Sequence, residues 1–136
     1  MEVMERSGIT ERLAVLLRPI LRRLFPKSSE NGEVLGAITE NVSANLLGLG
    51  NAATPAGVRA ARGMKRLSGP DASDELCTFV VLNTASIQLL PTTIAAVRAA
   101  HGAVSAFDIM PAVWISSLIS VGTGLAAAAM LKRVWR

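Results

Sequence analysis

The feature that most constrains this chain is the uneven distribution of its charged residues. Three long runs contain no Asp, Glu, Lys or Arg, namely residues 41–58, 76–97 and 109–131. The 14 basic and 10 acidic side chains all lie in the rest of the 136-residue chain. A helix of a soluble bundle carries a polar, charged face along its length, whereas about 20 apolar residues suffice to cross the hydrocarbon core of a bilayer. The runs predict an all-α, multi-pass membrane protein.

The net charge of +4 and the mean hydropathy of +0.43 indicate whether the chain binds nucleic acid or a membrane. A mild basic excess fits binding to nucleic acid, contact with an anionic membrane face, or the positive-inside bias of a membrane protein. Because the hydropathy is high for a soluble domain, we expect the membrane to be a partner and nucleic acid not to be one.

Residues 10–25 predict an amphipathic helix. Their large apolar side chains recur at helical spacing on one stripe, which consists of Leu13, Leu16, Leu17, Ile20, Leu21 and Leu24. Arginines occupy the other sides of the helix. Two interpretations stay open at this point: the stripe packs on another helix, or the helix lies in the membrane interface.

The first uncharged run, NVSANLLGLGNAATPAGV, is short for a span and rich in polar and helix-breaking residues. We expect the helix to fail between Gly48 and Pro55, with Gly50 as a further break. Basic residues flank the run on both sides, which favours the cytoplasm for both flanks. The sequence therefore predicts a broken, re-entrant hairpin over residues 34–66.

The second and third runs predict two further membrane segments. The second is long enough to span, but Pro91 and a group of polar residues interrupt its middle. A membrane tolerates such a break only where protein buries it or where it lines a wet cavity. We predict an interrupted helix over residues 72–100 and a transmembrane helix over 108–133. The C-terminus is expected in the cytoplasm because Lys132, Arg133 and Arg136 follow the third run.

Neutral polar side chains are the chemistry that these runs offer at membrane depth. Amide and hydroxyl groups can bind a neutral polar solute or coordinate Na⁺ through oxygen atoms. The other interpretation is that they hydrogen-bond helix to helix and bind nothing. The candidate solute-binding or ion-binding residues are Asn45, Asn51, Thr54, Asn83, Thr84, Ser86, Thr92 and Thr93.

Catalytic and nucleotide-binding readings find little support. A single cysteine, Cys77, and a single histidine, His101, provide no disulfide, no metal site and no catalytic dyad. The stretch GLGNAA (48–53) fits the dinucleotide pattern G-x-G-x-x-A, but the preceding ENVSANLL is not a strand pattern. We predict no catalytic residue, no metal and no cofactor, and we expect the protein not to be an enzyme.

Two segments carry a family likeness, NLLGLGNAATPAGVRA (45–60) and CTFVVLNTASIQLLPTTIAAVR (77–98). Together with RPILRRLFP (18–26), they resemble the bacterial spore maturation protein A family, whose members are membrane proteins with a Gate, or nucleoside-recognition, domain. The likeness runs from about residue 13 to residue 131. Further hydrophobic helices precede this region in the family. The resemblance thus implies one Gate-type domain over residues 1–136 that lacks its N-terminal helices.

The same resemblance implies a location in the bacterial inner membrane and a role in dehydrating the spore core, together with a related B-type partner. The Gate domain is also similar to part of the concentrative nucleoside transporters, where re-entrant hairpins and an interrupted helix shape the sites for solute and Na⁺. By that analogy the hairpin tip and the broken helix would bind a small polar solute or nucleoside, and Na⁺. We expect a permeation or gating subunit, and the alternative is a non-transporting membrane scaffold that assembles with its partner.

Overall fold

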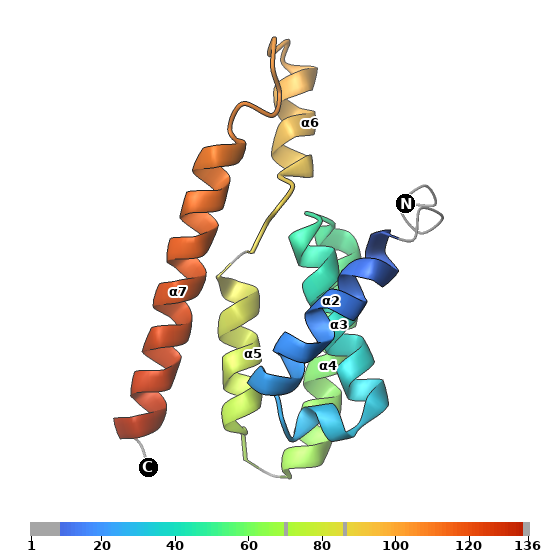
Figure 1. The fold of residues 1–136 in the computed structure, drawn as a ribbon, viewed down its shortest axis with the longest axis vertical. Coiled ribbons are helices and arrows are strands. Elements are labelled where there is room, and N and C mark those ends of the chain that lie inside the picture. Colours follow the sequence, from blue (N-terminus) through green and yellow to red (C-terminus); the bar gives the residue numbers. More distant parts are fainter. Residues whose placement is uncertain (1–8, 70, 86, 135–136) are drawn as a thin grey trace.

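The computed structural model describes residues 9–69, 71–85 and 87–134. Within these ranges all the regular structure is helical, and no residue is in a strand, so the predicted all-α class is confirmed (Figure 1). The elements are α2 (Ile9–Leu24), the short 3-10 helix η1 (Ser28–Glu30), α3 (Gly32–Leu46), α4 (Gly50–Ser68), α5 (Asp74–Thr84), α6 (Thr92–Ala100) and α7 (Met110–Val134).

Helix α2 buries only one edge of its apolar stripe. Leu21 is buried in the core, and Leu17 and Leu24 pack against that core. Leu16 and Ile20 lie outside it, with 68% and 61% of their surface exposed. The stripe therefore packs on the bundle along one edge and presents a second apolar edge outward, flanked by arginines.

Helices α3 and α4 form a hairpin that contains most of the core. Ile38 and Val42 of α3 are buried against the small residues Ala56 and Ala60 of α4. Small side chains bring the two helices close together. A methyl group added at Gly63 would lie 2.6 Å from a methyl carbon of Val34. The hairpin is therefore a packed unit that can hold side chains from both helices in fixed positions.

The hairpin turns at residues 47–49, and Gly48 makes this turn possible. Its φ is +69°, a conformation that residues with a side chain rarely adopt. An added Cβ at this position would lie 2.3 Å from the carbonyl oxygen of Leu90. Only glycine therefore meets both the backbone conformation and the close approach of the segment that precedes α6.

Two of the predicted helix breaks are wrong. Helix α4 begins at Gly50 and continues through Pro55 without interruption. Proline removes one backbone hydrogen bond, the one that would reach the carbonyl of Asn51, and this loss falls in the first turns of the helix. Packing of Ala56, Ala60 and Met64 on α3 outweighs this local cost. Gly48 lies in the turn instead, and Pro91 directly precedes α6.

Helices α5 and α6 are the two halves of an interrupted segment, and the described residues between them, 85 and 87–91, are not helical. Ser73 caps α5 by accepting a hydrogen bond from the Leu76 N–H. The non-helical stretch lies against the hairpin tip, because the Leu89 N–H donates to the carbonyl of Leu46 at 2.8 Å. The Trp114 indole N–H of α7 donates to the Leu89 carbonyl at 2.9 Å. The hairpin and α7 thus both bond to the main chain of Leu89.

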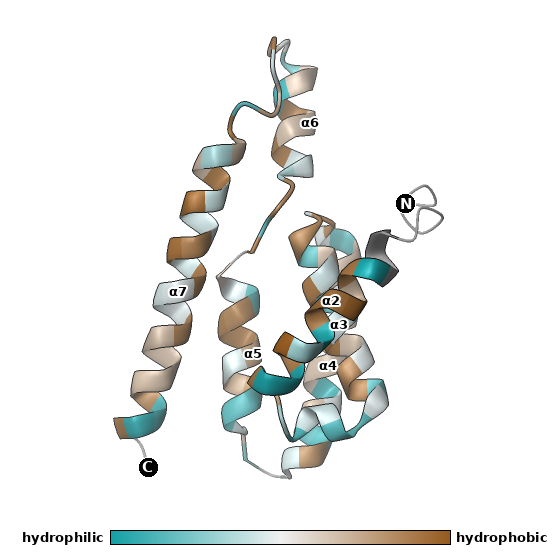
Figure 2. Cartoon of the chain, viewed as in Figure 1, coloured by the Kyte–Doolittle hydropathy of each residue, from teal (hydrophilic) through white to brown (hydrophobic). Residues whose placement is uncertain are grey.

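Helix α7 is the one helix in the described ranges that is long and apolar enough to cross a membrane. It packs along α5, where Gly124 comes close to Val81 and Ala85. None of its most apolar window is buried inside the molecule, and Leu118 is 74% exposed. Figure 2 shows apolar residues along the helix and hydrophilic ones at its C-terminal end. A helix with this pattern has an outer surface suited to lipid.

Basic residues gather at one end of the molecule. The last turns of α4 and α7 carry Lys65, Arg66, Lys132 and Arg133, and these two helix ends lie at the same end of the fold in Figure 1. The Lys132 ammonium is 3.0 Å from the Asp74 carboxylate at the start of α5. At the opposite end, Arg98 pairs with Asp108 at 2.6 Å.

Candidate functional site

Three asparagines make hydrogen bonds within the α3–α4 hairpin and between the hairpin and α5. The Asn45 side-chain amide of α3 donates to the Asn83 Oδ1 of α5 at 3.0 Å. Asn83 in turn donates to the carbonyl of Phe79 at 2.9 Å, within its own helix. Asn41, one turn before Asn45, donates to the Ala53 carbonyl of α4 at 2.8 Å. The amide of Asn41 thus bonds α3 to α4, and the amide of Asn45 bonds α3 to α5.

These asparagines line a cavity of about 460 Å³ between α3, α4 and α5, which we call the inner pocket. No charged residue lines it in the described part of the chain. Its polar lining consists of the amides and hydroxyls of Asn41, Asn45, Thr54, Asn83 and Thr84. The rest of the lining is apolar and consists of Gly50, Ala53, Gly57, Val58, Ala61, Phe79 and Val80. Such a neutral lining suits a polar, uncharged molecule.

The two threonines of the inner pocket bond to their own helices. Thr54 donates to the Gly50 carbonyl at 3.1 Å and Thr84 donates to the Val80 carbonyl at 2.9 Å. Both side chains are exposed. Because each hydroxyl proton is directed to a carbonyl, the hydroxyl oxygen has lone pairs that can accept a bond from a bound molecule.

The other predicted residues lie at a second cavity of about 510 Å³ near the hairpin turn, which we call the tip pocket. Asn51, Thr92 and Thr93 line it together with Gly48 and the start of α6. Thr92 donates to the Gly48 carbonyl at 3.0 Å, whereas the side chains of Asn51 and Thr93 are exposed. The predicted set is therefore divided between two pockets, and Ser86 lies outside the described residues.

Sequence reasoning missed Asn41 and the role of Gly57. Asn41 is only 2% exposed, and its Oδ1 has no hydrogen-bond partner among the described residues. A methyl group at Gly57 would lie 2.8 Å from the Asn41 Nδ2, so this glycine leaves room for the amide. The spacing of Asn41 and Asn45 is a signal that was present in the sequence, since residues four apart share one face of a helix.

A comparison with known proteins identifies the scaffold that holds these pockets. The Gate family, described by the words nucleoside recognition, matches residues 1–100. The chain belongs to the Gate family. Both pockets lie wholly within the matched residues, whereas α7 follows them.

This Gate-family chain is similar to spore maturation protein A of Bacillus subtilis (strain 168). The two sequences are 39% identical over 122 residues, which make up 88% of this chain and 62% of that protein. The chain thus spans less than two thirds of the length of this relative. The family resemblance predicted from the two segments is confirmed, and the chain is a Gate-domain protein similar in sequence to a spore maturation protein A. No solved structure matches it.

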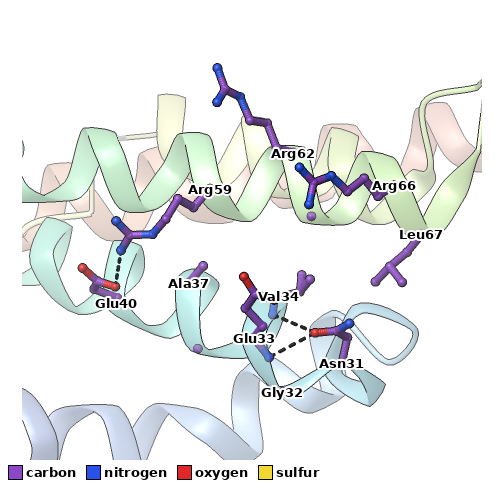
Figure 3. A pocket seen from close by; sticks show the side chains of 12 residues that line it. Asn31, Gly32, Glu33, Val34, Ala37, Glu40, Arg59, Arg62, Arg66 and Leu67 are labelled. Carbon is purple, nitrogen blue, oxygen red and sulfur yellow. Dashed lines mark hydrogen bonds and ion pairs between the residues drawn. The ribbon is translucent and has the colours of Figure 1, made fainter.

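A third cavity, of about 500 Å³, has a different chemistry. It lies between the start of α3 and the end of α4, where Arg59 pairs with Glu40 across the two helices (Figure 3). Asn31 caps α3 at the same end by accepting bonds from the N–H groups of Glu33 and Val34. This charged cavity marks the end of the hairpin that is richest in arginine and contrasts with the neutral inner pocket.

Proposed function

We propose that this Gate-domain protein is a solute permeation or gating subunit of the bacterial inner membrane that acts in spore maturation. The observation that carries the proposal is the neutral inner pocket, where amides of α3 and α5 meet between a re-entrant hairpin and an interrupted helix. Broken helices that face each other near the middle of a membrane are typical of solute sites in transporters. The proposed activity is passage or gating of a small polar solute rather than catalysis.

The hydrogen bond between Asn45 and Asn83 is the proposed gating contact. A bond between two neutral amides contributes about 0.5–1.5 kcal/mol net. Its loss is therefore small enough to be offset when a polar solute enters and bonds to the same amides. The Gly48 turn and residues 87–91 are the proposed joints at which the hairpin and the interrupted helix change their relative position.

The proposed topology places the basic end of the molecule in the cytoplasm. Both ends of the hairpin, the start of α5 and the end of α7 then lie on the cytoplasmic side, as the positive-inside rule favours. The short helices α5 and α6 together cross the membrane once, and α7 crosses back. Fusion of a reporter enzyme to the C-terminus, active only on one side of the membrane, tests this arrangement. Activity on the outer side would contradict it.

Na⁺ and a B-type partner belong to the proposal through the family resemblance. The oxygens of the tip pocket are the proposed ligands of a coupled Na⁺ ion. A related B-type subunit is the proposed partner in dehydrating the spore core. A nucleoside is the first solute to test, because the matched family is described as nucleoside recognition.

A non-transporting scaffold is the second candidate, and the uncovered apolar faces favour it. Ile94 and Val97 of α6 and Leu118 of α7 are each at least half exposed, so these helices offer surface for a partner in the membrane. In a scaffold, the amides of the inner pocket would hold α3, α4 and α5 together and bind nothing.

Flux in reconstituted vesicles separates the two candidates. Uptake of radiolabelled uridine and of radioactive Na⁺ is measured for the wild type, for Asn83→Ala in the inner pocket and for Asn51→Ala in the tip pocket. A permeation or gating role predicts flux that Asn83→Ala changes severalfold. The scaffold candidate prevails if neither solute passes in any variant while Asn83→Ala weakens copurification with the B-type partner.

A further inference from the structure

The orientation of the three asparagine amides in the inner pocket is fixed by their neighbours. The carbonyls of Ala53 and Phe79 can only accept hydrogen bonds, so the nitrogens of Asn41 and Asn83 must face them. The Oδ1 of Asn83 is therefore the atom that meets Asn45, which must donate through its own nitrogen. Flipping any one of these amides would place its side-chain oxygen against another oxygen, either a main-chain carbonyl or the Asn83 Oδ1.

In this orientation, one N–H of each amide is bonded to the protein. Each of the three amide nitrogens is hydrogen-bonded to an oxygen of the protein, and so is each of the hydroxyls of Thr54 and Thr84. The Asn41 Oδ1 is the exception among these polar atoms, because it is buried without a partner in the described part of the chain. A buried acceptor that lacks a donor destabilises the folded protein. A bound molecule that supplies the donor removes this cost.

We infer that the inner pocket binds an uncharged molecule that donates a hydrogen bond through N–H or O–H, and that Asn41 Oδ1 is the acceptor that selects it. This inference rests on the proposed function, because it takes the inner pocket as the solute site. It adds the chemical class of the solute and one residue, Asn41, that selects it.

The absence of charge in the wall favours a neutral molecule over an ion. No Asp, Glu, Lys, Arg or His lines the inner pocket among the described residues. An anion or a cation would lose its hydration here without an opposite charge in the wall to replace it. A neutral donor such as a primary amide avoids this penalty. The volume of about 460 Å³ lies within the range of small-molecule sites.

Two probes that differ only in their donors test the inference. Acetamide carries two N–H donors, and N,N-dimethylacetamide carries none. Binding to the purified full chain in detergent micelles is followed by ligand-observed NMR. We expect saturable binding of acetamide, and binding of the dimethyl compound that is at least threefold weaker. Equal affinity for both probes, or no saturable binding of acetamide because the site holds water only, would overturn the inference.

Substitutions at Asn41 and Gly57 test whether the binding of acetamide depends on the Asn41 side chain. Asn41→Leu removes the acceptor with little change of volume and is expected to weaken acetamide binding about threefold to tenfold. Because this variant also loses the bond to Ala53, Gly57→Ala provides a second test. Its added methyl would lie 2.8 Å from the Asn41 Nδ2 and must displace the amide.

Gly36→Ala is the matched control, because a Cβ at that helical glycine meets nothing within 4 Å and Gly36 does not line the inner pocket. It is expected to bind acetamide as the wild type does. An unchanged affinity in Gly57→Ala would contradict the role of Asn41. Binding that follows these expectations without any flux would contradict the proposed permeation role alone, so the two failures are distinguishable.

Discussion

The inner pocket and the tip pocket are held by different kinds of group. In the inner pocket, side chains of α3 and α5 bond to each other, as Asn45 does to Asn83. At the tip, the contacts between elements end on main-chain carbonyls: the Leu89 N–H donates to the Leu46 carbonyl, and the Thr92 hydroxyl donates to the Gly48 carbonyl. Side-chain identity therefore governs the inner pocket, whereas backbone conformation governs the tip.

The largest expected effect is at the tip and concerns its backbone. Gly48→Ala places a side chain at φ +69° and 2.3 Å from the Leu90 carbonyl oxygen, so both strain and a clash oppose folding. We expect the free energy of unfolding to fall by more than about 3 kcal/mol, measured by denaturant unfolding in detergent micelles.

Gly102→Ala separates the strain from the clash. Gly102 also has a positive φ, of +77°, but a Cβ there meets nothing within 4 Å. Its substitution should cost only the backbone term, about 1–2 kcal/mol. Similar losses in both variants would show that the close approach of Leu90 to the tip contributes nothing to stability.

The distinction between the two pockets is also where sequence reasoning met its limit. Absence of charge over long runs was enough to predict helices, a hairpin and an interrupted segment, because burying unpaired charge is costly everywhere in such a fold. The pattern also indicated Asn45 and Asn83, since polar residues inside apolar runs need partners. It did not indicate that Asn51 would lie away from them, because the geometry of the turn at residues 47–49 depends on tertiary contacts.

Local helix propensity predicted the wrong conformation at Gly50 and Pro55, and it did not predict the burial of Asn41. Gly50 and Pro55 have low helix propensity, yet α4 begins at Gly50 and continues through Pro55 because packing on α3 decides the conformation. Asn41 begins the first uncharged run and adjoins Glu40, so its place in the sequence does not distinguish a buried amide from a polar residue at the border of the run. It is buried because α4 covers that face of α3.

The second prediction concerns a side chain of the inner pocket. Asn83→Ala leaves the Asn45 amide without its partner and frees the Phe79 carbonyl, so we expect a loss of about 1–3 kcal/mol in the free energy of unfolding. Asn51→Ala at the exposed tip position is the control and should stay within about 0.5 kcal/mol of the wild type. A larger loss for Asn51→Ala than for Asn83→Ala would reverse the comparison.

The third prediction tests the Thr92 side chain, which bonds directly to the hairpin turn. Thr92→Val keeps the shape of the residue but removes its bond to the Gly48 carbonyl, which should cost about 1 kcal/mol. Thr93→Val changes an exposed neighbour and should cost less than about 0.5 kcal/mol. Unfolding curves of both variants, measured under the same conditions, provide the check. If the two curves coincide, the hydroxyl of Thr92 does not hold the tip.

The smallest expected change in stability is at the threonines of the inner pocket, where binding rather than folding should respond. The Thr84 hydroxyl bonds only within α5 in the structure, so Thr84→Val should alter the free energy of unfolding by less than about 0.5 kcal/mol. Its oxygen nevertheless lines the pocket, and we expect its loss to weaken acetamide binding about threefold. Thr78→Val is the matched control, because Thr78 makes the same bond to a carbonyl four residues earlier and does not line the inner pocket. Equal weakening of binding in both variants would mean that the effect comes from α5 as a helix, and the pocket hydroxyl would then have no part in recognising the solute.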